Sequence, residues 1–381
     1  MQAKPLKGIR VVEMGSSVAG PYGAWILAEL GAEVIKVEDP RTGDASRHWG
    51  PLNANGNSAM FETMNNGKKS IAVDLADEKE ASALRKLILD SADIVLQNLR
   101  PGFAERCGVG QSLTQQKPEL IYCDLGAYGK GGDLEMLPGY DPLMQGFTGL
   151  AQGTGTEHSP SRVAAPVIDF LTGIWSVVGA LSVLQARQST GKGGAVDVSL
   201  MESGIALMSM FAGLYQSTGQ RPQRRGLQGP LVAPNGGFET ADGLIMIVCG
   251  TNSLYAKLCG AIGRPDLLDD PRYRTAQERF ANRDALKADL EKVFTAKPRT
   301  YWIDIIGNAS VPVAPVHHVD EMMEHPQALA VGIIDTWGGD TSADAFKSVR
   351  LPIRIDGERS RYENRAPRLG EHNDEFFGEL G

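Results

Sequence analysis

Cysteine is scarce in this sequence and is not arranged as a ligand set. The 381 residues contain four cysteines, with no CxxC pair and no histidine at ligand spacing: Cys107, Cys123, Cys249 and Cys259. Zinc sites and disulfide-rich domains usually show such spacings. We therefore predict no metal site and no disulfide framework, and we expect the cysteines to be small core residues.

Runs of positive charge and long apolar runs are also missing. The formal net charge is −8, and the lysines and arginines form no sustained run, which argues against nucleic acid or an anionic membrane as the main partner. No uncharged apolar stretch reaches the length of a membrane span, and the first residues lack the apolar core of a signal peptide. We expect a cytoplasmic protein with no membrane partner.

The phosphate-binding fingerprints of nucleotide enzymes are absent too. The first glycine-containing turn, from Gly15 to Gly20, follows a predicted strand and precedes a predicted helix, but it fits neither GxGxxG nor the P-loop. The sequence therefore specifies no dinucleotide or ATP site. A nucleotide-dependent oxidoreductase is an alternative that lacks the motif on which hydride transfer depends.

Strands and helices alternate through the first half of the chain, which is typical of an α/β fold with a mostly parallel sheet. The predicted strands are residues 9–12, 33–37, 70–73, 93–97, 120–124 and 195–199. The main predicted helices are residues 21–30, 79–91, 174–184 and 200–215. With 42% apolar residues, the chain is long enough to bury a large core in about two domains.

The composition changes near residue 217. Residues 217–237 are rich in glycine, proline and arginine and show no periodicity, so we predict a domain boundary there. A smaller unit follows, with a predicted strand at 244–249 and helices at 253–262, 283–294 and 299–306. Two further strands are predicted in the tail, at 332–337 and 349–355.

One aspartate stands before the most apolar predicted helix. Asp169 precedes the run 174–184 by a few residues. As an N-cap, it would accept a hydrogen bond from an orphan backbone N–H. As a nucleophile, it would be a partly buried carboxylate that the positive end of the helix keeps ionised and directs at a substrate. The residue by itself leaves both interpretations open.

Short motifs occur in a fixed order along nearly the whole chain. They are GIRVVE (8–13), AGP (19–21), LGAEVIKVE (30–38), NLRPG (98–102), GYDP (139–142), Asp169 with Thr172-Gly173, GAVDVS (194–199), DPRY (270–273) and LGEH (369–372). In this set of motifs the chain resembles the class III (CaiB/BaiF-type) coenzyme A transferase family.

The resemblance implies a Rossmann-like large domain with a mostly parallel sheet, a smaller α/β domain and an interlaced homodimer. In that family the large domain combines N-terminal and C-terminal segments. We therefore expect residues 1–216 and 320–381 to form the large CoA-binding domain, residues 217–237 a linker and residues 238–319 the small domain. The partner's small domain is expected to close the active site.

The resemblance also implies a CoA-transferase that moves coenzyme A from an acyl-CoA donor to a carboxylic acid and holds no permanent cofactor. Asp169 matches the family's nucleophile, which forms an aspartyl–acyl anhydride and then an aspartyl-CoA thioester. Glycines near 235–237 are expected in a mobile loop that shields these intermediates. Contacts to coenzyme A are implied at Val18, Ala19, Val73, Asn98, Leu99, Arg100, Arg106, Gly139, Tyr140 and Asp141.

Two positions depart from the formyl-CoA:oxalate transferases of the family. Those enzymes carry glutamine at Val18, so a larger or less polar acyl group than formyl is expected here. They carry a basic residue at Asp39, and Arg41 is the alternative contact to adenine. Two other functions remain open: a 2-methylacyl-CoA racemase, whose histidine is replaced here by Tyr140, and a non-catalytic CoA-binding protein.

Overall fold

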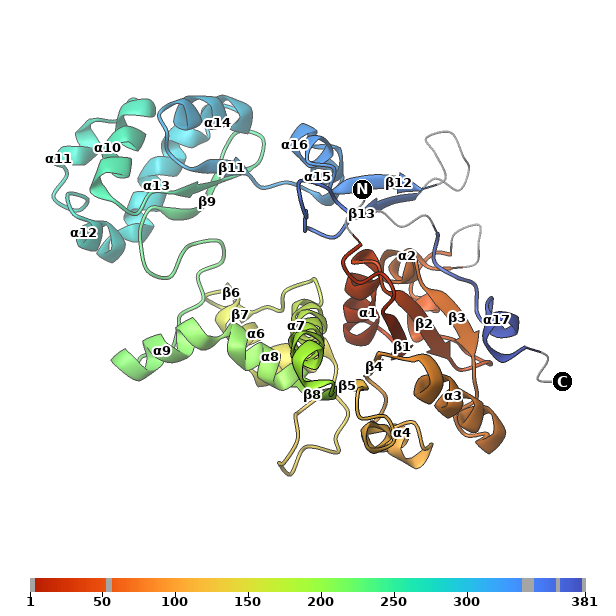
Figure 1. Ribbon diagram of the computed structural model, residues 1–381. Helices are drawn as coiled ribbons and strands as arrows, with labels where there is room; N and C mark the ends of the chain where they lie inside the picture. The colour runs from red at the N-terminus through yellow and green to blue at the C-terminus, as the bar shows by residue number, and fades with distance from the viewer. Residues whose placement is uncertain (1–3, 53–56, 338–345, 361–363, 379–381) are drawn as a thin grey trace. The chain divides into compact units, whose positions relative to one another are not determined.

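The computed structural model describes residues 4–52, 57–337, 346–360 and 364–378, and the chain forms two compact units (Figure 1). The first unit comprises residues 1–151, 162–213 and 329–381, and the second comprises residues 152–161 and 214–328. Residues 217–237, predicted as a linker, lie in the second unit. There Arg224 donates hydrogen bonds to the backbone carbonyls of residues 152, 156 and 157.

A six-stranded parallel sheet forms the centre of the first unit, in the order β3-β2-β1-β4-β5-β8. The strands are β1 (Arg10–Met14), β2 (Glu33–Glu38), β3 (Lys69–Ala72), β4 (Ile94–Gln97), β5 (Ile121–Gly126) and β8 (Gly194–Ser199). The direction of winding changes between β1 and β4, and open α/β sheets bind ligands at the carboxyl ends of the strands at such a point. The predicted Rossmann-like α/β fold is confirmed.

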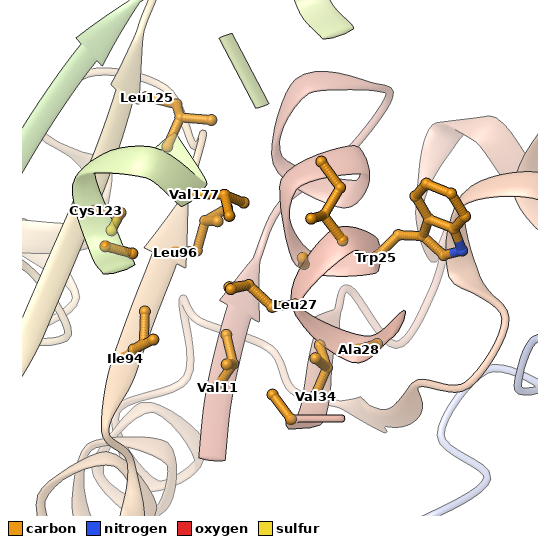
Figure 2. Close-up of a cluster of buried hydrophobic side chains, with 14 of the residues drawn as sticks. Val11, Trp25, Leu27, Ala28, Val34, Ile94, Leu96, Cys123, Leu125 and Val177 are labelled. Atoms are coloured by element: carbon orange, nitrogen blue, oxygen red, sulfur yellow. The ribbon is translucent and has the colours of Figure 1, made fainter. Parts of the chain in front are cut away.

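The two faces of the sheet are covered by different helices, because successive side chains of a strand point to opposite faces. Val11 of β1 packs with α1 (Ala19–Glu29) and α7 (Val167–Thr190) in the cluster shown in Figure 2. Val12, the next residue, packs on the other face with Leu84 and Ile88 of α3 (Glu78–Ser91). Both faces of the central strands are therefore buried.

Glycines allow α1 and α7 to cross at close range. A Cβ atom added at Gly173 would lie 2.8 Å from the Ala19 carbonyl oxygen, and one at Gly23 would lie 3.1 Å from the Gly173 oxygen. The helix α7 continues on both sides of the predicted run 174–184 and ends at Gly191, which has a left-handed φ of 68°. The first turns of α1 and α7 are thereby brought together.

By length and composition, α7 is the one helix in the described part of the chain that could cross a membrane, with a mean hydropathy of 1.9. One side of α7 lies in the core of the first unit, where Thr172, Ser176 and Ala180 are buried. Its other side exposes Ile174, Trp175 and Val178. Packing in the core therefore accounts for only one of its apolar faces.

The C-terminal segment covers the edge of the sheet beside β3. The backbone N–H of His372 donates to the carbonyl of Ser70, and the side chain of Asn373 accepts from the N–H of Ala72. Covering an edge strand in this way prevents it from pairing with another chain. The antiparallel pair β12 (Ile334–Trp337) and β13 (Phe346–Val349) precedes this segment. The strand predicted at 349–355 is wrong, because β13 ends at Val349.

The remaining elements of the first unit are short. They are η1 (Ala45–His48), α2 (Ala59–Asn65), α4 (Phe103–Arg106), η2 (Gln111–Gln115), α5 (Asp141–Phe147), α8 (Leu200–Leu207) and α17 (Asn373–Phe377), with α6 (Leu150–Gly153) and α16 (Pro326–Ala330) at its boundaries. The predicted helix 200–215 is divided at Met208 into α8 and α9 (Ser209–Thr218).

The second unit is built on the antiparallel sheet β11-β10-β9, with β9 (Asn235–Glu239), β10 (Leu244–Val248) and β11 (Val313–Pro315). Gly236 and Gly237 are buried in β9 opposite Ile247 and Met246, so the predicted mobile loop at 235–237 is wrong. The other elements are β6 (Gly155–Thr156), β7 (Ser159–Pro160), α10 (Asn252–Ala261), α11 (Asp266–Asp269), α12 (Ala276–Ala281), α13 (Arg283–Phe294), α14 (Arg299–Asn308) and α15 (Val319–Glu324).

Candidate active site

Asp169 is the third residue of α7 and lies where the first turns of α1 and α7 meet. Its side chain is partly buried, and its carboxylate has no hydrogen-bond partner among the described residues. The neighbouring Phe170 packs on Tyr22 of α1, with 4.6 Å between the ring centroids. The site therefore presents an unpaired carboxylate in a largely apolar setting.

The capping role belongs to a different residue. The N-cap of α7 is Pro166, and Asp169 caps nothing. Instead, Oδ2 of the buried Asp141 accepts hydrogen bonds from the backbone N–H groups of Ile168, at 2.8 Å, and of Asp169, at 3.4 Å. The interpretation of Asp169 as a helix cap is therefore wrong, and Asp141 satisfies the orphan donors from another helix, α5.

The ionisation of Asp169 depends on the surroundings of its carboxyl group. Burial, and after it the negative charge of Asp141, raise the pKa of Asp169 to about 7. The positive end of α7 is too weak to offset these two effects, because a helix terminus contributes only about 0.3–1 kcal/mol in most settings. A pKa of about 7 leaves about half of the carboxylates ionised at pH 7, so ionisation of Asp169 in the working enzyme stays a prediction.

Val18 and Ala19 lie at the start of α1, and the Ala19 carbonyl packs against Gly173, one helical turn beyond Asp169. Their side chains are buried, so only their backbones are available to a ligand. The N–H groups of Val18, Ala19 and Gly20 have no acceptor within the described ranges, as expected at the start of a helix. The turn that leads into them contains Ser17 in a left-handed conformation, with φ 72°.

Asn98 follows β4 and reaches across the switch point to the same turn. Its Oδ1 accepts from the N–H of Ser16, at 2.9 Å, and its Nδ2 donates to the carbonyl of Ser16, at 3.0 Å. The amide group of Asn98 thus holds the turn after β1. Leu99, the next residue, packs against the core on the α3 side, and its N–H donates to the side chain of Gln97.

Arg100 and Arg106 present exposed guanidinium groups near the carboxyl end of β4. Neither forms an ion pair within the described part of the chain, and Arg106 lies over the ring of Phe103 at 5.8 Å. Exposed arginines without acidic partners are suited to binding phosphate groups.

Val73, at the end of β3, is buried, and the charged residues around it are paired. Arg41 lies 2.8 Å from Asp39 and 3.7 Å from Asp74, and its side chain is 69% exposed. Two carboxylates therefore pair with Arg41. This arrangement leaves a flat guanidinium face but little net positive charge.

Gly139 and Tyr140 precede α5. A Cβ at Gly139 would lie 2.7 Å from Met144 and 2.8 Å from Ala127, so only glycine fits there. Tyr140 is 64% exposed, and the next residue is the buried Asp141. Of the predicted residues, the structure therefore joins Val18, Ala19 and Asn98 around one turn and joins Asp141 directly to Asp169.

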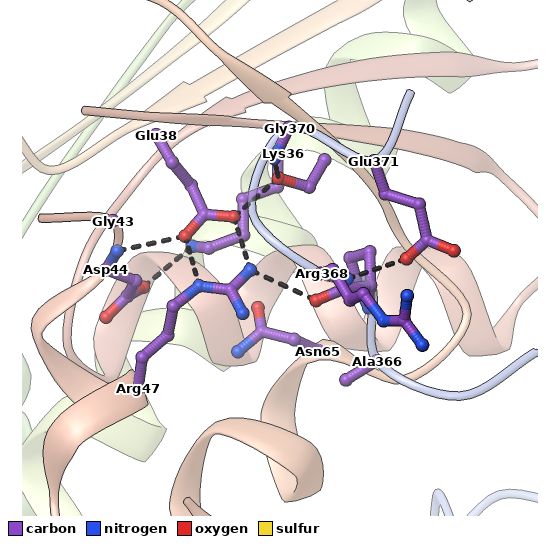
Figure 3. A network of polar contacts seen from close by, with 12 residues as sticks. Lys36, Glu38, Gly43, Asp44, Arg47, Asn65, Ala366, Arg368, Gly370 and Glu371 are labelled. Atoms are coloured by element: carbon purple, nitrogen blue, oxygen red, sulfur yellow. Dashed lines mark hydrogen bonds and ion pairs between the residues drawn. The ribbon is translucent and has the colours of Figure 1, made fainter. Parts of the chain in front are cut away.

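A buried ion network that was not predicted from the sequence lies next to the same turn. It consists of Glu13, Lys36, Glu38, Asp44, Arg47 and Lys68, all of them buried, and part of it is shown in Figure 3. Lys36 lies in the middle of β2, within an otherwise apolar segment. A charge in a strand that is buried on both faces requires a buried partner, and that signal was present in the sequence.

No group of three or more histidine, cysteine, aspartate or glutamate residues suited to a metal ion occurs within the ranges that the structure describes. Three of the four cysteines are buried and Cys107 is partly buried, in agreement with the prediction that they are mostly core residues.

The chain matches proteins of one family over nearly its whole length. Residues 6–373 match the family model described as CoA-transferase family III. The chain is 35% identical over 371 residues to the acetyl-CoA:oxalate CoA-transferase of Acetobacter aceti, which covers 96% of this chain and 93% of that protein. It is 31% identical over 385 residues to the succinate–glutarate CoA-transferase of Agrobacterium fabrum, covering 99% and 96%.

Solved structures agree with these matches. A CAIB/BAIF family protein from Brucella suis has a TM-score of 0.89 at 33% identity, and the match covers 100% of both chains. The chain therefore belongs to CoA-transferase family III and is an enzyme of that family.

Proposed function

We propose that this enzyme transfers coenzyme A from an acyl-CoA donor to a carboxylic acid acceptor, with Asp169 as the covalent nucleophile. The observation that carries this proposal is the unpaired, partly buried Asp169 carboxylate at the meeting point of α1 and α7. Its raised pKa and its place beside the switch point of the sheet are both typical of functional carboxylates.

The reaction proceeds in four acyl-transfer steps. The Asp169 carboxylate attacks the donor thioester carbonyl, the C–S bond breaks, and CoA thiolate leaves an aspartyl–acyl anhydride. The thiolate then attacks the aspartyl carbonyl of the anhydride, which releases the donor acid and forms an aspartyl-CoA thioester. The acceptor carboxylate attacks this thioester and frees the thiolate again. Attack of the thiolate on the acceptor acyl group releases the new acyl-CoA and restores Asp169.

Each tetrahedral intermediate in these steps carries an oxyanion. The free N–H groups of Val18 and Ala19 are preorganised donors at the start of α1, next to the first turn of α7. Donors of this kind are the main means by which proteins stabilise oxyanions. We assign them this role, with contacts to the acyl end of the substrate made by the backbone.

The remaining contacts to coenzyme A follow the edge of the sheet. Arg100 and Arg106 are proposed to bind the phosphate groups, because they are exposed cations without acidic partners. The face of Arg41 beyond Val73 is proposed to stack on the adenine ring. Gly139 and Tyr140 border the reactive end beside Asp141.

The enzyme is proposed to act as an interlaced homodimer. The first unit exposes a set of large apolar side chains on α5, α7 and α8, and such a face is typical of an interface. Its members include Leu143, Phe147, Ile174, Trp175, Val178 and Ile205. A monomeric mass in sedimentation at micromolar concentration would contradict this part of the proposal.

The acids remain to be identified by assay. The relatives named above are an acetyl-CoA:oxalate and a succinate–glutarate CoA-transferase, so we propose a small mono- or dicarboxylic acid as the acceptor. Acetyl-CoA and succinyl-CoA would be tested as donors against a panel of acids that includes oxalate and glutarate, with products read by mass spectrometry.

Trapping tests the nucleophile directly. Wild-type enzyme is mixed with donor acyl-CoA and hydroxylamine, and the modified residue is mapped by peptide mass spectrometry. We expect a hydroxamate at Asp169 and none in the Asp169→Ala variant, which should retain coenzyme A binding. A label at another residue refutes the assignment. Exchange of an α-proton in deuterated water without movement of coenzyme A would instead indicate a 2-methylacyl-CoA racemase.

A further inference from the structure

Side chains from three other segments form hydrogen bonds with the backbone of the turn from Gly15 to Ser17. Lys36 of β2 donates to the carbonyl of Gly15, at 2.9 Å. Asp44 accepts from the N–H of Ser17, at 3.1 Å. With the two bonds that Asn98 makes to Ser16, every residue of the turn is fixed through its backbone by a side chain distant in sequence.

The ion network continues under the first turn of α1. Lys68 donates to the carbonyl of Pro21, at 2.8 Å, and lies 2.7 Å from Glu13. The other oxygen of Glu13 is 2.8 Å from Lys36. Glu13 therefore links the two lysines. These lysines bond to the carbonyls of Gly15 and Pro21, on either side of the free N–H groups of Val18 and Ala19.

Lys36 is the centre of this arrangement. It is fully buried, and its ammonium group has three partners: Glu13, Asp44 at 2.7 Å and the Gly15 carbonyl. Two of these contacts, to Glu13 and to the Gly15 carbonyl, are hydrogen bonds, and the contact to Asp44 is an ion pair. The ammonium group thus joins the strand β1, the turn that follows it and the segment that begins at Asp44.

Stability alone does not account for such a network. Replacing a buried ion pair by apolar residues of similar volume is often neutral or stabilising, because desolvation offsets most of the Coulombic attraction. Hydrogen bonds and ion pairs are directional, whereas apolar packing is not, so each bond to the backbone fixes the position of one backbone atom. Here the fixed atoms lie in the turn that leads into α1.

The turn is coupled to Asp169 through close packing. The Ala19 carbonyl lies where a Cβ at Gly173 would clash, one helical turn beyond Asp169. A shift of the turn would therefore displace the Val18 and Ala19 backbones relative to the nucleophile. A misplacement of about 1 Å in reacting groups can cost 100-fold in rate.

We propose that Lys36 is a positioning residue of the transfer reaction: without touching the substrate, it fixes the turn that leads to the Val18 and Ala19 N–H groups, which meet the thioester at Asp169. The proposal rests on the proposed function of Asp169. It predicts an effect on the acylation of Asp169 that exceeds any effect on coenzyme A binding, because Arg100 and Arg106 hold the phosphates elsewhere.

Single-turnover kinetics test the proposal. The rate constant for formation of the enzyme-bound CoA thioester is measured by rapid quench, and the amplitude gives the fraction of folded sites. For Lys36→Met we expect a rate constant 10- to 100-fold below that of the wild type, with the Kd for coenzyme A, from calorimetry, within about three-fold. A general loss of structure would instead lower the amplitude and weaken binding.

Two controls separate positioning from stability. Lys69→Met removes the lysine that follows Lys68 in the sequence. Lys69 pairs with Glu33 and Glu375 and does not touch the turn. Ser70→Ala removes a 2.6 Å bond to Glu38 in the outer part of the network. Both variants should keep the wild-type rate constant within about two-fold.

Two further variants serve if Lys36→Met does not fold. Lys36→Met combined with Glu13→Gln removes one charge of each sign and leaves the network balanced. Asp44→Asn removes the charge beside Lys36 and keeps an oxygen for Ser17, so it should slow acylation less than the loss of Lys36 does. A wild-type rate constant in a folded variant that lacks Lys36, or a slow one in both controls, overturns the proposal. If the wild type itself forms no thioester at Asp169, the proposed function fails first.

Discussion

Replacing Asp169 by asparagine should stabilise the folded protein while abolishing transfer. The carboxylate is partly buried, faces the charge of Asp141 and has no hydrogen-bond donor among the described residues. The amide of asparagine has nearly the same shape and no charge. The variant therefore removes an unfavourable charge from the folded state without removing a favourable contact.

The size of the effect follows from the pKa. A rise from the ordinary value of 3.8 to about 7 corresponds to about 4 kcal/mol, at about 1.4 kcal/mol per pH unit. The side chain keeps some contact with solvent, so we expect about 2–4 kcal/mol. The free energy of unfolding changes with pH in the opposite sense to that of a protein with a salt-bridged aspartate, because here the folded state holds the proton more tightly than the unfolded state does. Stability is lost as the pH rises from about 4 to about 7 and stays lower above that.

Urea unfolding at fixed protein concentration measures this difference. The free energy of unfolding of Asp169→Asn should exceed that of the wild type by a margin that widens by about 1–2 kcal/mol between pH 5 and pH 8. The exposed Asp90→Asn serves as a control and should show a margin within about 0.5 kcal/mol at both pH values. A margin for Asp169→Asn that is independent of pH would refute the raised pKa.

Three other outcomes are expected. The pH at which acylation by acyl-CoA reaches half its maximum should lie near 7, the pKa of Asp169, and should fall in Asp141→Asn, because the opposing charge is gone. Arg106→Gln should raise the KM for acyl-CoA about ten-fold with little change in kcat, as measured in steady state at low salt, because it loses a phosphate contact. Gly173→Ala should lower the free energy of unfolding by about 1–3 kcal/mol in urea titrations, because its Cβ meets backbone at 2.8 Å. Gly213→Ala, which meets open space, should not lower it.

The sheet could be predicted from the sequence because its signals are local. Apolar strands alternate with amphipathic helices, and the six predicted strands match the six observed ones to within about two residues at most ends. The order of the strands was not predicted, because the pattern of apolar residues does not show which strands are neighbours. The division of residues 200–215 at Met208 had no local signal, since neither glycine nor proline stands at that position.

The site was predicted in part. Asp169 was identified through its motif, yet its environment depends on Asp141, 28 residues earlier in the chain, and no local pattern predicts that contact. The same limit applies to Asn98, because its two hydrogen bonds to Ser16 also join segments far apart in the sequence, and its contact with coenzyme A stays a prediction. Gly236 was placed in a mobile loop because the family resemblance implied one. Glycine also occurs in strands where another chain segment packs closely, and here Gln228 does so.

The raised pKa of Asp169 is compatible with its role as a nucleophile. At pH 7 about half of the sites would be protonated, which costs only a factor of two in rate. In return, burial and the charge of Asp141 disfavour the free carboxylate relative to any neutral form of the side chain. The anhydride and the thioester are neutral forms, as the protonated acid is, so the environment that raises the pKa also stabilises both covalent intermediates relative to the free carboxylate. Removing the charge of Asp141 should therefore lower the fraction of enzyme held as aspartyl-CoA thioester at equilibrium, in parallel with the fall in the pKa of Asp169.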